Sequence, residues 1–309
     1  MILSVSRRTD IPAFYTDWFF NRLNDGFVYV RNPINKNHIS KVSLLPEHVD
    51  CFVFWTKNPE PFIKRLSELS EYKFYFQFTL NSYSKDLEPG VARKREIIDT
   101  FINLSQKIGK EKVIWRYDPI LLSEKYTIEY HIKYFNSLAE RLHPYTEKCV
   151  ISFIDLYKKC ERNLKNTTVK EIPEEKINIL SQKLKDITLK YNISLETCAE
   201  NVELASLGIG HNRCVDNVLI ERILKKQIKV SKDKNQRDEC GCVESIDIGA
   251  YNTCKHGCLY CYANFNHQMV TDNWNKHSTS SPLLFGEVGE NDKVVERKAK
   301  SIITKTLFG

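Results

Sequence analysis

The chain has no apolar run that approaches the roughly 20 residues needed to cross a bilayer as a helix. Its first residues, Met-Ile-Leu-Ser-Val-Ser-Arg-Arg, also lack the apolar segment of a secretory signal peptide. We therefore expect a cytoplasmic protein with no membrane partner. Disulfides are rare in that reducing compartment, so the 10 cysteines are better interpreted as metal ligands or core residues than as disulfides.

Several common catalytic motifs are also absent. The sequence contains no G-x-G-x-x-G, no P-loop, no G-x-S-x-G and no H-E-x-x-H. Dinucleotide, P-loop nucleotide, α/β-hydrolase and zincin chemistry therefore find no support. Methionine, glycine and proline are few, at 2, 11 and 10 of 309 residues. The rest of the composition is typical of a globular enzyme, and the length suits one α/β barrel or two smaller domains.

Three closely spaced cysteines near the C-terminus are the most informative feature present. Cys254, Cys258 and Cys261 have the spacing C-x3-C-x2-C, and Tyr260 directly precedes the third. Three thiolates can hold three irons of a [4Fe–4S] cluster, and no cysteine follows that could bind the fourth iron. That iron would be open to an external ligand. The alternatives are a zinc knuckle and an iron–sulfur site that only holds the C-terminal tail in place.

A second, looser group consists of Cys198, Cys214, Cys240 and Cys242. Four thiolates could bind a second [4Fe–4S] cluster or a zinc ion. Alternatively, Cys198 and Cys214 are buried apolar residues, because free cysteine is among the most buried residue types. The remaining cysteines, Cys51, Cys149 and Cys160, are expected in the core or in loops.

A recurring pattern predicts the fold. Short β-branched or aromatic runs end in polar residues, and segments with apolar residues at helical spacing usually follow. The predicted helices cover 94–108, 127–142 and 174–191. The predicted strands are Ile2–Ser6, Cys51–Trp55, Phe74–Phe78, Val113–Trp115, Val150–Ile154, Ile193–Leu195 and Val243–Ile248. Strands that alternate with helices predict a parallel α/β sheet or barrel.

Three segments fall outside this alternation. Residues 26–44 predict an inserted β-hairpin, residues 160–173 a polar loop, and Val294–Ile303 a terminal helix. We expect residues 1–230 to form the body of the barrel. Residues 231–309 would complete the barrel as a cluster-binding segment and add the C-terminal tail.

The candidate site residues follow from this pattern, because the active site of such a barrel lies at the carboxyl ends of its strands. Arginine suits bidentate capture of a carboxylate, although Arg116 and Asp118 could simply pair with each other. The catalytic or substrate-binding candidates are Arg7, Arg8, Asp10, Lys57, Arg116 and Asp118. The cofactor-binding candidates are Gln77, Glu200 and Tyr260. His256 could tune a cluster, and Trp55 and Trp115 could stack on a base or lie in the core.

The cysteine spacing resembles the C-x3-C-x-aromatic-C signature of the radical S-adenosylmethionine (SAM) superfamily. Cys254, Cys258, Tyr260 and Cys261 match it position by position. The resemblance implies that the open iron binds the amino and carboxylate groups of SAM. One electron then cleaves SAM to methionine and a 5′-deoxyadenosyl radical. The motif usually follows the first barrel strand, so its late position here implies a circularly permuted (β/α) barrel, complete or partial, or a different kind of cluster protein.

The whole chain also resembles an uncharacterised bacterial family, a domain of unknown function sometimes grouped with spore photoproduct lyase. The resemblance is carried by residues 6–10, 54–59, 115–119, 198–200 and 240–242. It implies no reaction.

We therefore expect a radical SAM enzyme whose radical abstracts hydrogen from a substrate, with flavodoxin or ferredoxin as reductant. The net charge of +7 and the lyase-like resemblance favour a nucleic acid or nucleotide substrate, while a small metabolite or peptide stays open. The rival interpretation is a nucleic-acid-binding protein stabilised by zinc or an iron–sulfur cluster, without SAM chemistry. An iron–sulfur electron-transfer protein is disfavoured, because no fourth cysteine lies near the motif.

Overall fold

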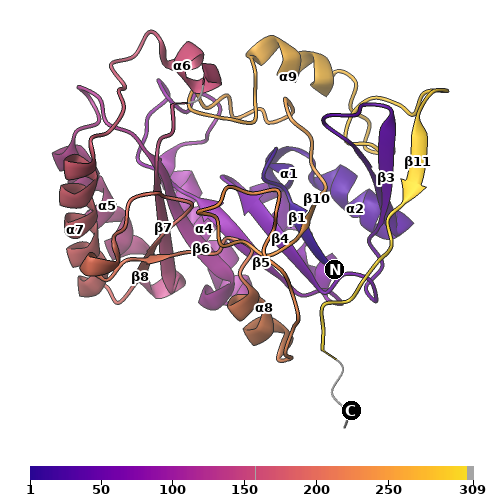
Figure 1. The fold of residues 1–309 in the computed structure, drawn as a ribbon, viewed down its shortest axis with the longest axis horizontal. Coiled ribbons are helices and arrows are strands. Elements are labelled where there is room, and N and C mark those ends of the chain that lie inside the picture. The colour runs from indigo at the N-terminus through magenta and orange to yellow at the C-terminus, as the bar shows by residue number, and fades with distance from the viewer. Residues whose placement is uncertain (157, 305–309) are drawn as a thin grey trace.

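The computed structural model describes residues 1–156 and 158–304. Its centre is an eight-stranded sheet in which every neighbouring pair of strands is parallel (Figure 1). The order across the sheet is β10-β1-β4-β5-β6-β7-β8-β9. The strands are β1 (Ile2–Val5), β4 (Cys51–Thr56), β5 (Phe74–Thr79), β6 (Val113–Ile120), β7 (Lys148–Phe153), β8 (Ser194–Thr197), β9 (Gly210–His211) and β10 (Ile246–Asp247).

All seven predicted strands lie in this sheet, so the α/β class with a parallel sheet is confirmed. The sequence analysis missed β9, because two residues are too few to show a period. The last predicted strand is shorter than expected, since only Ile246 and Asp247 pair with β1. Strands β9 and β10 form the two edges of the sheet, and no pairing between them occurs in the described residues.

One face of the sheet carries a layer of helices. The helices predicted over 94–108, 127–142 and 174–191 lie in it to within a residue, whereas the helix over Thr16–Asp25 was not predicted. Residues two apart on a strand face the same side, so Leu3, Phe54 and Trp115 all point toward this helical layer. Trp115 stacks on Phe135 with ring centroids 4.8 Å apart and is a core residue. The helices that pack here are α2 (Thr16–Asp25), α4 (Lys94–Ile108), α5 (Ile128–Leu142) and α7 (Glu174–Lys190).

The opposite face is covered by a different part of the chain. Helix α8 (Asn217–Leu224) and the buried residues Cys214, Val215 and Val243 pack against Cys51 and Tyr75 of the sheet. Figure 1 shows α8 at the lower end of the strands, whereas α6 (Lys158–Leu164) and α9 (His267–Trp274) lie above their upper end. The short helices α1 (Ile11–Phe14) and α3 (Glu60–Ile63) follow β1 and β4.

The predicted hairpin is confirmed: β2 (Phe27–Arg31) and β3 (His38–Ser43) pair antiparallel. The predicted terminal helix is wrong, because β11 (Lys293–Glu296) adds to β3 as a parallel strand (Figure 1). An ion pair between Arg31 and Asp292, 2.6 Å apart, fixes the start of β11 against the hairpin.

The polar loop predicted at 160–173 is partly wrong, because helix α6 extends to Leu164. Leu164 is buried in the main core, and this tertiary contact outweighs the polar composition of the segment. No helix in the described part of the chain is long and apolar enough to span a membrane.

Candidate functional site

The cysteine loop, residues 252–264, continues from β10 and lies over the carboxyl ends of β1, β4 and β5. Hydrogen bonds to two other segments fix its position. The Tyr15 hydroxyl donates to the Thr253 carbonyl at 2.7 Å, and Gly90 N donates to the His256 carbonyl at 2.8 Å. Leu259 N donates to the Leu87 carbonyl at 3.0 Å. The pairing of β10 with β1 thus brings a motif from the end of the chain to the first strand.

The cysteine triad, Cys254, Cys258 and Cys261, lies within this loop and is largely shielded from water. Burial raises the pKa of the Cys258 thiol to about 12, although the nearby Lys57 ammonium opposes that rise. Tyr260 hydrogen-bonds to Cys258, and Ala263 N donates to the Cys261 sulfur at 3.4 Å. Donors directed at sulfur stabilise thiolates, and metal binding deprotonates such buried thiols.

No group of three or more His, Cys, Asp or Glu side chains among the described residues is arranged to hold a metal ion. Three cysteine thiolates are nevertheless the donor type that a [4Fe–4S] cluster takes, and such a cluster at the triad stays a prediction.

Asp10 connects the cysteine loop to two strand ends. One carboxylate oxygen caps helix α1 by accepting from Ala13 N at 3.0 Å. The other accepts from Lys57 N and from His256 Nε2, each at 2.7 Å. Asp10 is only 5% exposed. We predicted it as a catalytic or substrate-binding residue, and in this structure it holds the cysteine loop in place.

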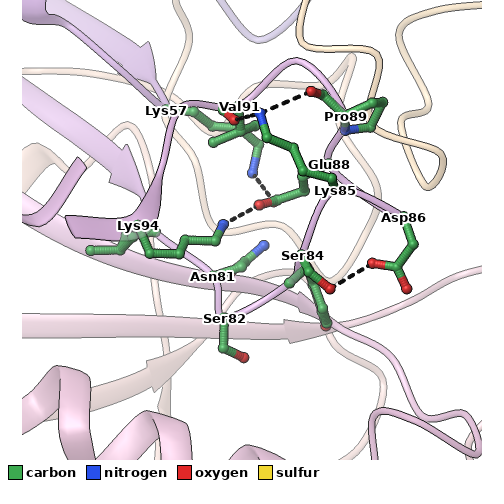
Figure 2. Close-up of polar contacts among 12 residues, drawn as sticks. Lys57, Asn81, Ser82, Ser84, Lys85, Asp86, Glu88, Pro89, Val91 and Lys94 are labelled. Carbon is green, nitrogen blue, oxygen red and sulfur yellow. Dashed lines mark hydrogen bonds and ion pairs between the residues drawn. The ribbon is translucent and has the colours of Figure 1, made fainter. Parts of the chain in front are cut away.

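A buried carboxylate that the sequence analysis missed lies beneath the loop. Figure 2 shows Glu88 between Lys57 and Lys94. Lys57 Nζ is 2.9 Å from Glu88 Oε1, Lys94 pairs with Glu88 Oε2, and the Tyr260 hydroxyl donates to Glu88. Burial alone would raise the pKa of Glu88, but the two ammonium groups lower it to about 2. Asn81 Nδ2 also reaches the Tyr260 hydroxyl, at 3.2 Å.

Two arginines face one tryptophan on the side of the sheet opposite the helical layer. The guanidinium carbons of Arg7 and Arg116 lie 5.5 Å and 5.3 Å from the centroid of the Trp55 ring. Arg116 pairs with Asp118, as the alternative interpretation of these two residues in the sequence analysis predicts. Arg7 lies 3.7 Å from Asp233.

The remaining predicted site residues, Arg8, Gln77 and Glu200, each contact other residues of the chain. Arg8 lies 4.0 Å from Asp247 and stacks its guanidinium on Tyr251. Gln77 donates to the Cys214 carbonyl at 2.8 Å. Glu200, beyond β8, accepts from Phe153 N at 2.8 Å, and burial raises the pKa of its carboxyl to about 8. The candidates at the ends of β1, β4, β5 and β6 are thus gathered, and their contacts with a ligand stay predictions.

Unpartnered polar atoms gather around the same strand ends. Seven buried side-chain nitrogen or oxygen atoms in the described part of the chain have no hydrogen-bond partner. Five of them lie in or beside the cysteine loop or the strand ends below it: Thr9 Oγ1, Trp55 Nε1, Asn81 Oδ1, His256 Nδ1 and Asn264 Oδ1. Buried polar groups are almost always paired, so this concentration points to a polar ligand or water at this site.

Gly90 is required by the close approach of the cysteine loop. A Cβ at this position would lie 2.6 Å from the carbonyl oxygens of both His256 and Lys255. Gly90→Ala is therefore expected to displace the loop, to cost about 1–3 kcal/mol of stability and to lower metal retention by the triad. Urea unfolding and metal analysis would check this. The matched control is Gly210→Ala, where a Cβ would meet nothing within 4 Å. Equal stability and equal metal content of the two variants would contradict the prediction.

Comparison with known proteins identifies the family of the chain. The family described as "Domain of unknown function (DUF1848)" matches residues 2–263. The chain belongs to this family. The matched residues include the whole eight-stranded sheet and nearly all of the cysteine loop, so both are parts of the DUF1848 domain. The predicted resemblance to an uncharacterised family is thus confirmed. The comparisons give no support for membership of the radical SAM superfamily, which rests on the cysteine motif alone.

No curated protein matches the chain. Among solved structures, a Bacteroides thetaiotaomicron protein provisionally assigned as an α-L-fucosidase matches with a TM-score of 0.27 and 12% identity. The match covers 53% of this chain and 72% of that one. A likeness this remote carries no argument about the fold or the activity.

Proposed function

We propose that this DUF1848 protein is a radical SAM enzyme built on a permuted, partial (β/α) barrel, with the cysteine triad as the ligands of a [4Fe–4S] cluster. One observation carries the proposal. A loop with three cysteines lies at the carboxyl ends of parallel strands, where partnerless buried polar atoms also gather. When bound, the cluster would supply the electron that cleaves SAM and so initiates removal of hydrogen from a substrate.

The residues around the triad would position the loop and exclude water. Lys57 and Tyr260 connect the buried Glu88 to the loop, and Asp10 holds His256. These contacts involve both charged and neutral donors, which makes the geometry of the loop rigid. A rigid, shielded site suits radical chemistry, because side reactions with water and oxygen must be prevented.

Arg8 is the best placed group for a ligand carboxylate. Its side chain is 22% exposed, its nearest carboxylate contact with Asp247 is 4.0 Å, and it lies over the exposed ring of Tyr251. Arg7 is more enclosed and faces the second cysteine group. We therefore assign the SAM or substrate carboxylate to Arg8 rather than to Arg7.

A nucleic acid or nucleotide is the substrate class that we favour. The chain has a net charge of +7, and two tyrosines, Tyr251 directly before the cysteine loop and Tyr262 within it, are 37% and 50% exposed. Exposed aromatic rings can stack on bases, and cationic side chains attract phosphates. The electron would come from a reductant such as flavodoxin or ferredoxin.

The test uses protein purified without oxygen. Iron and sulfide are counted, dithionite and SAM are added, and 5′-deoxyadenosine is measured by mass spectrometry. Cys258→Ala is expected to lose the iron of the triad and all 5′-deoxyadenosine. Cys149→Ala, which removes a fully buried thiol from the helical face, should keep both.

Two results would overturn the proposal. The first is cleavage of SAM by Cys258→Ala at the wild-type rate. The second is zinc in the triad, or iron with neither 5′-deoxyadenosine nor a SAM-induced spectral change. Zinc in the triad, or iron that does not respond to SAM, would favour the metal-stabilised binding protein instead if nucleic-acid affinity also falls steeply with salt.

A further inference from the structure

The four cysteines of the looser group come together on the face of the sheet that α8 also covers. Cys198 follows β8, Cys214 follows β9, and Cys240 and Cys242 precede β10. The sulfurs of Cys198 and Cys214 are 3.1 Å apart. The Cys214 thiol also hydrogen-bonds to Cys242, and Cys242 to Cys240. The thiols of this cysteine quartet therefore form one continuous row, although 44 residues of sequence separate its first and last members.

Cationic and N–H donor groups surround the sulfurs of the quartet. Arg116 Nη1 lies 2.7 Å from the Cys214 sulfur, and Asn212 Nδ2 lies 3.2 Å from it. Val215 N donates to the Cys242 sulfur at 3.4 Å. The positive charge of Arg7 also acts on Cys242. Cations and N–H donors directed at sulfur are what metal-bound thiolates need, and purely apolar core cysteines have no use for them.

The arrangement is also too polar for four cysteines that only fill space. Cys214 and Cys242 are 2% and 3% exposed, and the guanidinium beside them is buried as well. Burying Arg116 is costly, and Asp118 is the one carboxylate among the described residues that pairs with it. A further negative charge on the sulfurs would stabilise both arginines that face the quartet.

We propose that Cys198, Cys214, Cys240 and Cys242 bind a second metal centre through four thiolates. Thiolates select zinc or iron–sulfur clusters, and four protein ligands close the centre to substrate. No group of three or more His, Cys, Asp or Glu side chains in the described residues, the quartet included, is already arranged to hold a metal ion. The sulfurs of the quartet would therefore have to move apart as the metal replaces the thiol protons. This centre does not depend on the proposed function, since the quartet shares no cysteine with the triad.

The location of the quartet suggests what the centre does. Arg7 and Trp55 lie between it and the strand ends below the cysteine loop. Segments after β8 and β9 and before β10 meet at the quartet, and these strands include both unpaired edges of the sheet. A metal there would tie the two edges together, so its loss should destabilise the fold as well as change the metal content.

The test measures iron, zinc and sulfide in the full-length chain purified without oxygen. The double variant Cys240→Ser/Cys242→Ser is compared with wild type and with Cys149→Ser as the control. If both centres are [4Fe–4S] clusters, iron should fall from about eight to about four per chain. If the quartet binds zinc, one zinc should be lost and the iron should stay. The control should lose neither metal.

Alkylation of the wild-type protein gives an independent measurement if the double variant does not fold. Metal-bound quartet cysteines should resist iodoacetamide until a chelator is added. Unchanged metal content in the double variant, ready alkylation without chelator, or a Cys198–Cys214 disulfide in oxygen-free protein would overturn the second centre. The triple variant Cys254→Ser/Cys258→Ser/Cys261→Ser keeps the two questions separate. It should lose the metal of the triad alone, so failure of the proposed function leaves the quartet result intact.

Discussion

Glu88→Gln is expected to destabilise the folded chain by about 3 kcal/mol, because it leaves the partly buried ammonium groups of Lys57 and Lys94 without their counter-ion. Glu88 is 2% exposed, and its two oxygens accept from Lys57 and Lys94. The amide keeps the shape of the side chain but removes its charge. Since Lys57 and Tyr260 connect Glu88 to the cysteine loop, the variant should also retain less metal in the triad.

Asp86→Asn is the matched control, because Asp86 belongs to the same loop (Figure 2). Its pair with Lys125 is exposed, with 46% and 55% of the two side chains accessible to solvent. Exposed pairs contribute about 0–1 kcal/mol, so this variant should unfold at nearly the wild-type urea concentration. Equal stability of the Glu88 and Asp86 variants would show that the buried network is not what holds the loop.

The buried Glu88 carboxylate also makes the stability of the folded chain depend on pH. The pKa of Glu88 is about 2 in the folded chain, below its ordinary value of 4.5. The stability that this shift contributes, about 3 kcal/mol, is present above pH 4.5 and is lost as the pH falls toward 2. Glu88→Gln should lack this part of the acid sensitivity.

Lowering the pH from 7 to 5 is expected to cost about 2 kcal/mol of stability through His131 alone. His131 is fully buried; its Nε2–H donates to the Leu121 carbonyl at 2.9 Å, and its Nδ1 lies 2.7 Å from the Tyr117 hydroxyl. Burial disfavours the imidazolium and lowers the pKa of His131 from 6.5 to about 4. Between these pH values the unfolded chain binds the proton and the folded chain does not, so stability falls as the solution becomes more acidic.

Urea unfolding at several pH values from 7 to 5 would check this prediction. His131→Gln should lower the stability at pH 7, because the buried hydrogen bonds are disturbed, and should flatten the slope between pH 7 and 5. His143→Gln, at an exposed position after α5, should leave the slope unchanged. An unaltered slope in His131→Gln would show that another group causes the acid sensitivity. The Glu88 effect lies below pH 4.5, so one titration separates the two.

Much of the secondary structure could be predicted from the sequence, because it depends on neighbours along the chain. Strands such as Cys51–Thr56 show runs of β-branched and aromatic residues, and α4 shows apolar residues at helical spacing. The hairpin and the cysteine spacing are equally local. The gathering of polar candidates at the strand ends also followed from the sequence, since parallel strands place their carboxyl ends at one edge.

The sequence could not predict which of these polar groups are already paired. Glu88 and Lys94 belong to no motif, and the partners that bury Glu88 come from distant parts of the chain. Likewise, the sequence predicts that Asp10 is available to a ligand, whereas in the fold its carboxylate accepts from Lys57 N and His256 Nε2. Pairing of ions depends on distances in space, and those distances have no signal at short sequence separation.

By itself, the sequence of this protein determined the alternation of strands and helices and the three-cysteine motif, because local spacing and side-chain type govern both. The tertiary structure alone decided that β10 lies beside β1, that β11 extends the hairpin in place of a helix, and that four distant cysteines form one row. The physical reason is that these arrangements are set by burial and by the satisfaction of hydrogen bonds across the whole fold, where residues more than 200 positions apart, such as Lys57 and Tyr260, meet at 3.0 Å.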